Sequence, residues 1–294
     1  AIELDVDAVS DGTEILIGGI MEHVESAGVH SGDSACMIPP VNLDKGTLRR
    51  VREITEKIAQ ALKIVGLLNI QLAIKNEEIY VLEANPRASR TVPFVSKATG
   101  VPIAKVAAKV MSGKTLKEVG VKEQIPVQVS VKEVVLPFSR LPGVDPCLGP
   151  EMKSTGEIMS TSDSFGKSYA KAQVAIGKPI PISGNAIVDL DSAEFPDPES
   201  DRGKKLIESL EEFFQIRYFE DEKSMRDAIA NEEIDIIISR DRRILEIAVE
   251  EVITYFSTCS SAEAAIEAIK SEGESNCVEA VGDRKKVQGQ WGLD

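Results

Sequence analysis

The side chains best suited to chemistry are Glu83 and Asn85, which close one hydrophobic stretch of the chain. The segment from Leu68 to Arg90 has two apolar runs separated by the polar residues 76–78, which predicts a β-hairpin with a three-residue turn. Such a turn would place Gln71 opposite Glu83, and strand alternation would put Asn85 on the same face. One carboxylate and two amide oxygens are hard ligands of the kind that Mg²⁺ accepts, so the pattern predicts a metal site.

Two arginines follow this ligand set directly. Arg87 and Arg90 come just after Pro86, and guanidinium groups beside a metal suit a transferring phosphoryl group, whose oxygens carry negative charge. The sequence therefore indicates a metal and nucleotide site. An ordinary hairpin with a solvated polar end fits the same spacing, because Glu and Asn two residues apart are a common pair.

Both histidines of the chain fall in one short segment, M-E-H-V-E-S-A-G-V-H-S-G-D. His30 lies between Gly28 and Gly32, where the absence of side chains lets the backbone approach a ligand closely. His23 fits a structural role as well as a catalytic one. Taken alone, G-V-H-S-G also fits a simple turn.

Several long motifs resemble the large subunit of carbamoyl phosphate synthetase. They are G-V-H-S-G-D-S-A from residue 28, E-A-N-P-R-A-S-R-T-V-P-F from residue 83, S-V-K-E-V-V-L-P-F from residue 130 and G-V-D-P-C-L-G-P-E-M-K-S-T-G-E from residue 143. The run R-T-V-P-F after N-P-R-A-S resembles the second, carbamate-phosphorylating ATP-grasp half of that subunit. The resemblance implies a cytoplasmic enzyme that phosphorylates carbamate with MgATP, giving carbamoyl phosphate for arginine and pyrimidine biosynthesis.

The same resemblance implies a role for each candidate residue. Glu83 would bridge two Mg²⁺ or Mn²⁺ ions, with Asn85 and Gln71 each holding one. The positions implied as catalytic are Arg87, Arg90 and His23, the last beside the carbamate pocket, and those implied to bind ATP are Gly28, Val29, His30, Ser31, Gln71 and Glu83. The implied partners are the remainder of the large subunit and a glutaminase small subunit.

Composition is consistent with such an enzyme and excludes other classes. The chain has 294 residues, room for about two domains, and a formal charge of −14, which argues against a nucleic-acid binder. No apolar run approaches the ~18 residues of a membrane span, and no signal peptide is recognisable. The four cysteines are scattered and form no C-x-x-C pair, so we expect free thiols and no zinc site or disulfide framework.

The predicted fold class combines α/β and α+β architecture in two units. Residues 1–175 would form the C-terminal part of the carbamate-phosphorylating ATP-grasp domain, residues 176–270 a diverged methylglyoxal-synthase-like regulatory domain with a small parallel sheet, and residues 271–294 a polar tail. Within the first unit, apolar residues at helical spacing from Leu48 to Val65 predict a helix that Gly66 stops.

The regulatory domain departs from the resemblance at two turns. Relatives carry phosphate-binding turns there, whereas this chain has the acidic segments 219–221 and 239–241. Negative side chains repel a phosphate, so the substitution argues against a phosphorylated effector.

Two other functions remain open. One is a different ATP-grasp carboxylate-amine ligase, which V-H-S-G-D-S and E-V-V-L-P-F disfavour; the other is a non-catalytic fragment that binds an effector or docks a subunit. The chain begins at Ala1 without an initiator Met and lacks a glycine-rich phosphate loop. We therefore expect a partial protein that does not turn over alone.

Overall fold

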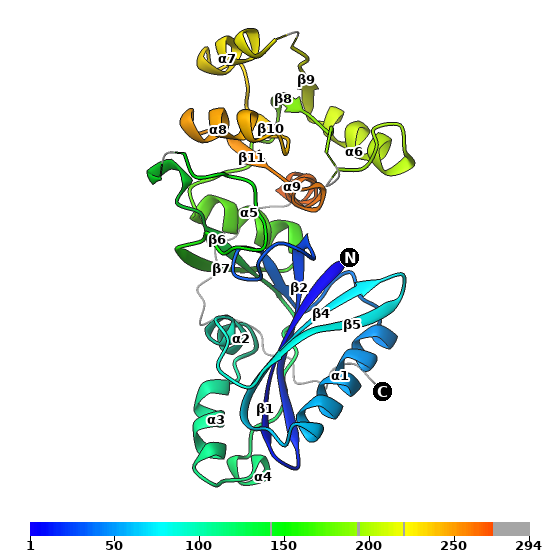
Figure 1. Cartoon of the computed structure of the whole chain (residues 1–294), viewed down its shortest axis with the longest axis vertical. Coiled ribbons are helices and arrows are strands. Elements are labelled where there is room, and N and C mark those ends of the chain that lie inside the picture. Colours follow the sequence, from blue (N-terminus) through cyan, green and yellow to red (C-terminus); the bar gives the residue numbers. More distant parts are fainter. Residues whose placement is uncertain (142, 193–194, 220, 273–294) are drawn as a thin grey trace.

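The computed structural model describes residues 1–272 apart from 142, 193–194 and 220, and it contains two β-sheets of different kinds. Figure 1 shows the larger sheet in the lower half of the molecule and the smaller one above it. The predicted mixture of helices and strands is confirmed. Most of the predicted tail, including Cys277, lies outside the described residues.

The larger sheet has the strand order β5-β4-β1-β2-β3-β6-β7, and every pair of neighbours is antiparallel. Its strands are β1 (Ile2–Asp11), β2 (Ile15–Ser26), β3 (Cys36–Ile38), β4 (Val65–Lys75), β5 (Glu78–Asn85), β6 (Val129–Val135) and β7 (Gly156–Ser162). Its helices are α1 (Lys45–Ala61), α2 (Val92–Thr99), α3 (Ile103–Met111), α4 (Leu116–Val119) and α5 (Phe165–Ala175), with a 3₁₀ turn at Phe138–Arg140.

Helices cover both faces of this sheet around the central strand β1. Leu4 belongs to the core under α1, whereas Val9 belongs to the core under α2 and α3. Because side chains alternate along a strand, the face that carries Val9 also carries three acidic residues, Glu3, Asp5 and Asp7. One face of β1 therefore carries a row of three buried carboxylates.

Two glycines of β2 let α2 and α3 approach the sheet closely. A Cβ on Gly19 would lie 3.0 Å from a methyl group of Val95 in α2, and one on Gly18 would lie 2.8 Å from Ile103 in α3. Both contacts are closer than ordinary van der Waals packing allows. The close approach brings α2, which begins just after Arg90, down onto β2, the neighbour of the strand that carries the acidic row.

The predicted helix from Leu48 to Val65 is wrong at its C-terminal end. It ends at Ala61, and Gly66 lies in β4 with a φ of +119°. Lys63 takes a left-handed conformation, φ +52°, and turns the chain from helix to strand. At the other end, the Asp44 carboxylate accepts the backbone N–H of Thr47 at 2.9 Å and caps the helix.

The smaller sheet is parallel, as predicted, with the strand order β11-β10-β8-β9. Its strands are β8 (Gly184–Val188), β9 (Phe214–Ile216), β10 (Ile236–Ile238) and β11 (Thr254–Phe256), and its helices are α6 (Asp201–Glu211), α7 (Glu222–Ala230), α8 (Arg242–Glu250) and α9 (Cys259–Glu272). Strand β9 begins at Phe214, whose side chain is buried in the core.

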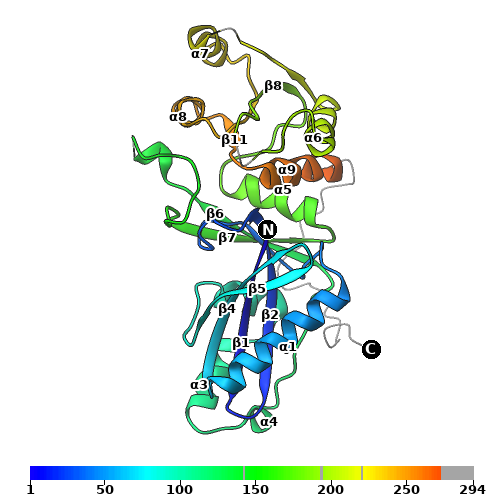
Figure 2. The same ribbon diagram turned by 45° about the vertical axis from the view of Figure 1, so that its right-hand side comes forward.

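The two sheets meet through a pair of packed helices. Figure 2 shows α9 lying on α5, which in turn covers β6 and β7. Phe165 and Tyr169 of α5 share one apolar core with Ala265 and Ile269 of α9. That core continues across the predicted boundary after residue 175, so the two units are packed against one another.

Candidate active site

A cavity of about 720 Å³ is lined by the segments that the sequence singled out. The segments that contribute to the lining are the start of β1, the loop at 28–32, strands β4 and β5, the segment 87–91 and the chain at 150–157. Of the predicted site residues, it is lined by Gly28, Val29, His30, Ser31, Gln71, Glu83, Arg87 and Arg90. His23 and Asn85 do not line it.

The hairpin places Gln71 opposite Glu83, as predicted, but by a different route. The turn has two residues, Asn76 and Glu77, both with positive φ, so the predicted three-residue turn is wrong. A register shift follows at Leu82, which has no partner on β4, and this bulge restores the predicted pairing.

Two rows of polar residues therefore cross three neighbouring strands. Asp5 on β1 faces Gln71 on β4, which faces Glu83 on β5. The second row runs two residues further along, from Asp7 through Asn69 to Asn85, the predicted metal ligand. Cross-strand neighbours on one face lie about 5 Å apart, so each row holds its polar groups together.

The predicted ligand set keeps its oxygen atoms available. Asn85 Nδ2 donates to Glu83 Oε1 at 2.7 Å, and Gln71 Nε2 donates to Ser31 Oγ at 2.9 Å. Both amide nitrogens are thereby engaged, which leaves both amide oxygens as acceptors. One carboxylate and two amide oxygens suit a hard divalent cation with phosphate oxygens completing its coordination. No group of three His, Cys, Asp or Glu suited to a metal occurs among the described residues.

The loop at 28–32 presents backbone to the cavity. Gly28 has a φ of +119°, which a residue with a side chain rarely adopts. His30 N donates to Gly149 O at 2.8 Å, and Gly32 N donates to His30 Nδ1 at 3.0 Å, so the imidazole is folded back over its own loop. These contacts hold the loop between the sheet and the chain at 150–157.

The segment 87–91 has two exposed arginines, and the residues next to Arg90 are held by hydrogen bonds to β1. Arg87 and Arg90 are both exposed and both line the cavity. Between and after them, Ser89 and Thr91 donate to Asp7 on β1. The arrangement offers two exposed positive charges on an anchored backbone.

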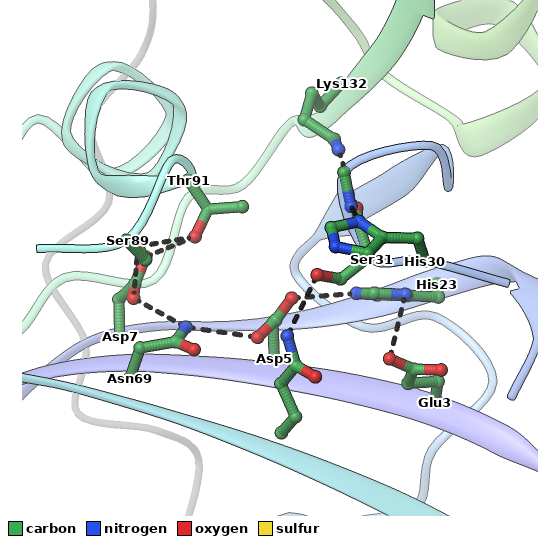
Figure 3. A network of polar contacts seen from close by, with 12 residues as sticks. Glu3, Asp5, Asp7, His23, His30, Ser31, Asn69, Ser89, Thr91 and Lys132 are labelled. Carbon is green, nitrogen blue, oxygen red and sulfur yellow. Dashed lines mark hydrogen bonds and ion pairs between the residues drawn. The ribbon is translucent and has the colours of Figure 1, made fainter. Parts of the chain in front are cut away.

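His23 is buried, and Figure 3 shows its ring between the carboxylates of Asp5 and Glu3. Its Nε2 lies 3.1 Å from Asp5 Oδ2, while its Nδ1 has no hydrogen-bond partner among the described residues and lies 3.9 Å from Glu3 Oε1. Glu3 and Asp5 line the cavity themselves. Burial raises the pKa of Glu3, partly offset by the adjacent His23.

A lysine also reaches this network from β6. Lys132 is 1% exposed, and its Nζ donates to Ser31 O at 3.3 Å (Figure 3). Burial opposes its charge, but the acidic groups around it, with Cys36 the strongest, outweigh burial and raise its pKa. A buried positive charge therefore lies behind the loop that the family resemblance implies to bind ATP.

The sequence interpretation missed the carboxylates and the lysine. A signal was present, since acidic residues at every second position of E-L-D-V-D predict one polar face on a strand. Lys132 gave no such signal, because V-S-V-K-E-V-V fits any strand with one solvated face. The missed residues that line the cavity or lie under it are Glu3, Asp5, Asp7, Asn69, Ser89, Thr91, Lys132 and Glu157.

Comparison with known proteins agrees with the resemblance. Residues 1–119 match a family model described as carbamoyl-phosphate synthase L chain, ATP binding domain. The carbamoyl phosphate synthase large chain of Halobacterium salinarum is 54% identical over 99% of this chain. This chain is homologous to part of that large chain. The match covers 26% of the Halobacterium protein, so this chain spans about a quarter of the length of that relative.

Other large chains match in the same way. The carbamoyl phosphate synthase large chain of Methanosphaerula palustris is 63% identical over 66% of this chain and 18% of its own length. That of Archaeoglobus fulgidus is 45% identical, with coverage of 98% and 28%. Among solved structures, the biotin carboxylase domain of a single-chain bacterial carboxylase matches at a TM-score of 0.46 and 16% identity, over 58% of this chain and 46% of that one. That structural likeness is too weak to support a conclusion.

The acidic turns of the smaller sheet act as helix caps. Asp221 accepts the backbone N–H of Ser224 at 2.7 Å, and Asp241 accepts that of Arg243 at 2.8 Å. Glu220 lies outside the described residues. Both helix N-termini are therefore already satisfied by a carboxylate of the chain.

In the part of the chain that the structure describes, no helix is long and apolar enough to span a membrane.

A second, smaller cavity lies between the two sheets. It measures about 50 Å³ and is lined by Glu25 and Glu133 from the larger sheet and by Tyr255 from the smaller one. Burial raises the pKa of both carboxyl groups, and for Glu25 repulsion by Glu133 adds to the effect of burial. Asp33 and Lys178 also line this cavity.

Proposed function

We propose that this chain forms part of the carbamate-phosphorylating site of a glutamine-dependent carbamoyl phosphate synthetase, in which carbamate attacks MgATP to give carbamoyl phosphate and ADP. The observation that carries the proposal is the cavity in which the Gln71 and Glu83 pair, Arg87, Arg90 and the loop at 28–32 come together. Homology to carbamoyl phosphate synthase large chains supports it. Carbamoyl phosphate would serve arginine and pyrimidine biosynthesis in the cytoplasm.

Each part of the cavity has a role in this proposal. Glu83, Gln71 and Asn85 would hold two Mg²⁺ or Mn²⁺ ions, which neutralise charge on the transferring phosphoryl group. The backbone of Gly28 to Ser31 would lie along the nucleotide. Arg87 and Arg90 would offset charge that develops on the phosphoryl oxygens as carbamate attacks.

The buried network would keep this site ordered. His23 is buried and pairs with Asp5, which lines the cavity, and this pair would orient the acidic row beside carbamate. Lys132 balances part of the negative charge of the acidic row. Preorganised charges of this kind act most strongly where water is excluded.

The proposal includes the remaining partners. Residues 1–175 would belong to the second ATP-grasp domain and residues 176–270 to a methylglyoxal-synthase-like regulatory domain. The rest of the large subunit would complete the nucleotide site, and a glutaminase small subunit would supply ammonia.

In the regulatory unit, Asp221 and Asp241 lie at the helix N-termini where a phosphorylated effector would bind, and their negative charge disfavours an anionic effector. The sequence resemblance implies nucleotides or ornithine as effectors. We expect UMP and IMP not to raise the melting temperature of the full-length protein. A shift with UMP or IMP that disappears in the Arg242→Ala, Arg243→Ala double variant would contradict this assignment.

Activity of the full-length protein that carries this sequence tests the main proposal. We expect MgATP-dependent formation of carbamoyl phosphate from bicarbonate and ammonia. A full-length protein that hydrolyses ATP with these substrates but forms no carbamoyl phosphate would favour another carboxylate-amine ligase.

A further inference from the structure

Asp7 is a buried carboxylate to which the proposed reaction assigns no role. It is 1% exposed, lies on β1 below the cavity and does not line it. Three side chains nevertheless donate to it: Asn69 Nδ2 at 2.9 Å, Ser89 Oγ at 2.7 and 2.9 Å, and Thr91 Oγ1 at 2.7 Å. Figure 3 shows these groups converging on the carboxylate.

Two of these donors flank Arg90. Ser89 precedes it and Thr91 follows it, so the backbone of the arginine is held on both sides by one carboxylate. Thr91 is also the N-cap residue of α2, yet its side chain makes no capping hydrogen bond. A threonine at this position normally caps its helix, so its hydroxyl is used for the tether instead.

The third donor links Asp7 to the predicted metal ligands. Asn69 donates to Asp7 at 2.9 Å and to Asp5 at 3.0 Å, and it faces Asn85 across the strands β4 and β5. Asn85 in turn donates to Glu83. The arginine segment and the ligand hairpin, which are consecutive in sequence, are thus both linked by hydrogen bonds to Asp7, which lies far from them in sequence.

The burial of the Asp7 carboxylate costs free energy, so a role in the stability of the fold alone does not explain this residue. Desolvation raises the pKa of Asp7 to about 6, and the hydrogen bonds from Thr91, Ser89 and Asn69 only partly oppose the effect. A buried ionised group is retained most readily where its hydrogen bonds serve a further purpose.

We propose that Asp7 is a positioning residue that fixes Arg90 relative to the Gln71 and Glu83 pair. The proposal rests on the phosphoryl-transfer function proposed above. Asp7 touches no substrate; it acts through the backbone of the arginine segment. Displacement of a charged group by about 1 Å from its productive position can lower a rate by about a hundredfold.

Asp7→Asn in the full-length protein tests this role. The amide has nearly the shape of the carboxylate but cannot accept all three donors, so we expect kcat to fall by about tenfold or more. We expect KM for MgATP to change by less than about threefold, because the loop at 28–32 is untouched. The matched control is Asp11→Asn on the same strand, where the carboxylate accepts backbone N–H groups of Thr13, Glu14 and Leu116 away from the cavity.

Turnover separates the two variants when each is assayed well below its own melting temperature. Asp11→Asn should leave kcat within about twofold of the parent although it removes hydrogen bonds from the fold, whereas Asp7→Asn should lower kcat. Equal losses in both variants, or a kcat of Asp7→Asn within about threefold of the parent, would overturn the proposal. Thr91→Val, with Thr91→Ser as its rescue, gives the same test if Asp7→Asn does not fold.

A double variant identifies the arginine as the group that Asp7 positions. In an Arg90→Lys background we expect Asp7→Asn to lower kcat by no more than about a further twofold, because the positioned group is already lost. If the two substitutions lower kcat by factors that multiply in the double variant, the proposal is overturned. An inactive parent protein would instead refute the proposed function, which separates the two failures.

Discussion

Asp33→Asn should loosen the chain segment that closes one side of the cavity. Asp33 is 1% exposed, and its two carboxylate oxygens accept the backbone N–H groups of Lys153 at 2.7 Å and Ser154 at 2.8 Å. An amide at this position accepts only one of them and turns an NH₂ group towards the other. Loss of one hydrogen bond to a charged acceptor costs about 1.5–3 kcal/mol, and the second is weakened from charged to neutral.

We therefore expect the free energy of unfolding to fall by about 2–4 kcal/mol. Urea unfolding of this chain at pH 7 measures the change, with the slope m unaltered. The control is Asp44→Asn at the exposed N-cap of α1, where Asn caps as well as Asp, so that variant should stay within about 0.5 kcal/mol of the parent. An Asp33→Asn midpoint equal to that of Asp44→Asn would refute the reasoning.

Two further predictions concern stability alone. Glu123→Ala removes a bidentate ion pair with Arg52, at 2.6 and 2.8 Å, and the acceptor of the Ile17 N–H at 2.8 Å. Urea unfolding should show that the free energy of unfolding falls by about 2–4 kcal/mol in Glu123→Ala and by less than about 0.5 kcal/mol in the control Glu56→Ala. Equal losses in the two variants would contradict this prediction. Burial raises the pKa of Glu133 above its ordinary value of 4.5, so the folded state retains a proton that the unfolded state releases. The free energy of unfolding should then fall as pH rises from about 5 to 8, and less steeply in Glu133→Gln; identical slopes would exclude this group as the cause.

The pairing of Gln71 with Glu83 could be predicted from the sequence because alternation and a turn signal are local properties. The turn itself could not, since Glu77 adopts a positive φ without the glycine that usually marks it. The prediction of the pairing nevertheless held, because the bulge at Leu82 shifts the register by one residue. The sequence predicts that Gly66 ends the helix α1, but Gly66 lies inside β4, where it adopts a positive φ.

The buried network could not be derived from the sequence for a different reason. Its contacts join residues that are far apart, such as Ser89 and Asp7, which are separated by 82 positions. A single sequence contains no distance information across such a separation, and a polar residue on a strand most often faces solvent. The motif at Glu83 indicated the ligand hairpin, but only the folded sheet brings Asp7 and Asn69 beneath it.

The most direct test of the proposed function is phosphoryl transfer in reverse, from carbamoyl phosphate to MgADP, measured as ATP formed by the full-length protein. Glu83→Gln removes the carboxylate of the predicted ligand set, and the lost charge stabilisation of about 3 kcal/mol corresponds to about a hundredfold fall in rate. Glu78→Gln, on the same strand but away from the cavity, should stay within about twofold of the parent. We predict ATP formation in the parent and in Glu78→Gln and its loss in Glu83→Gln; a Glu83→Gln rate within about tenfold of the parent would contradict the assignment.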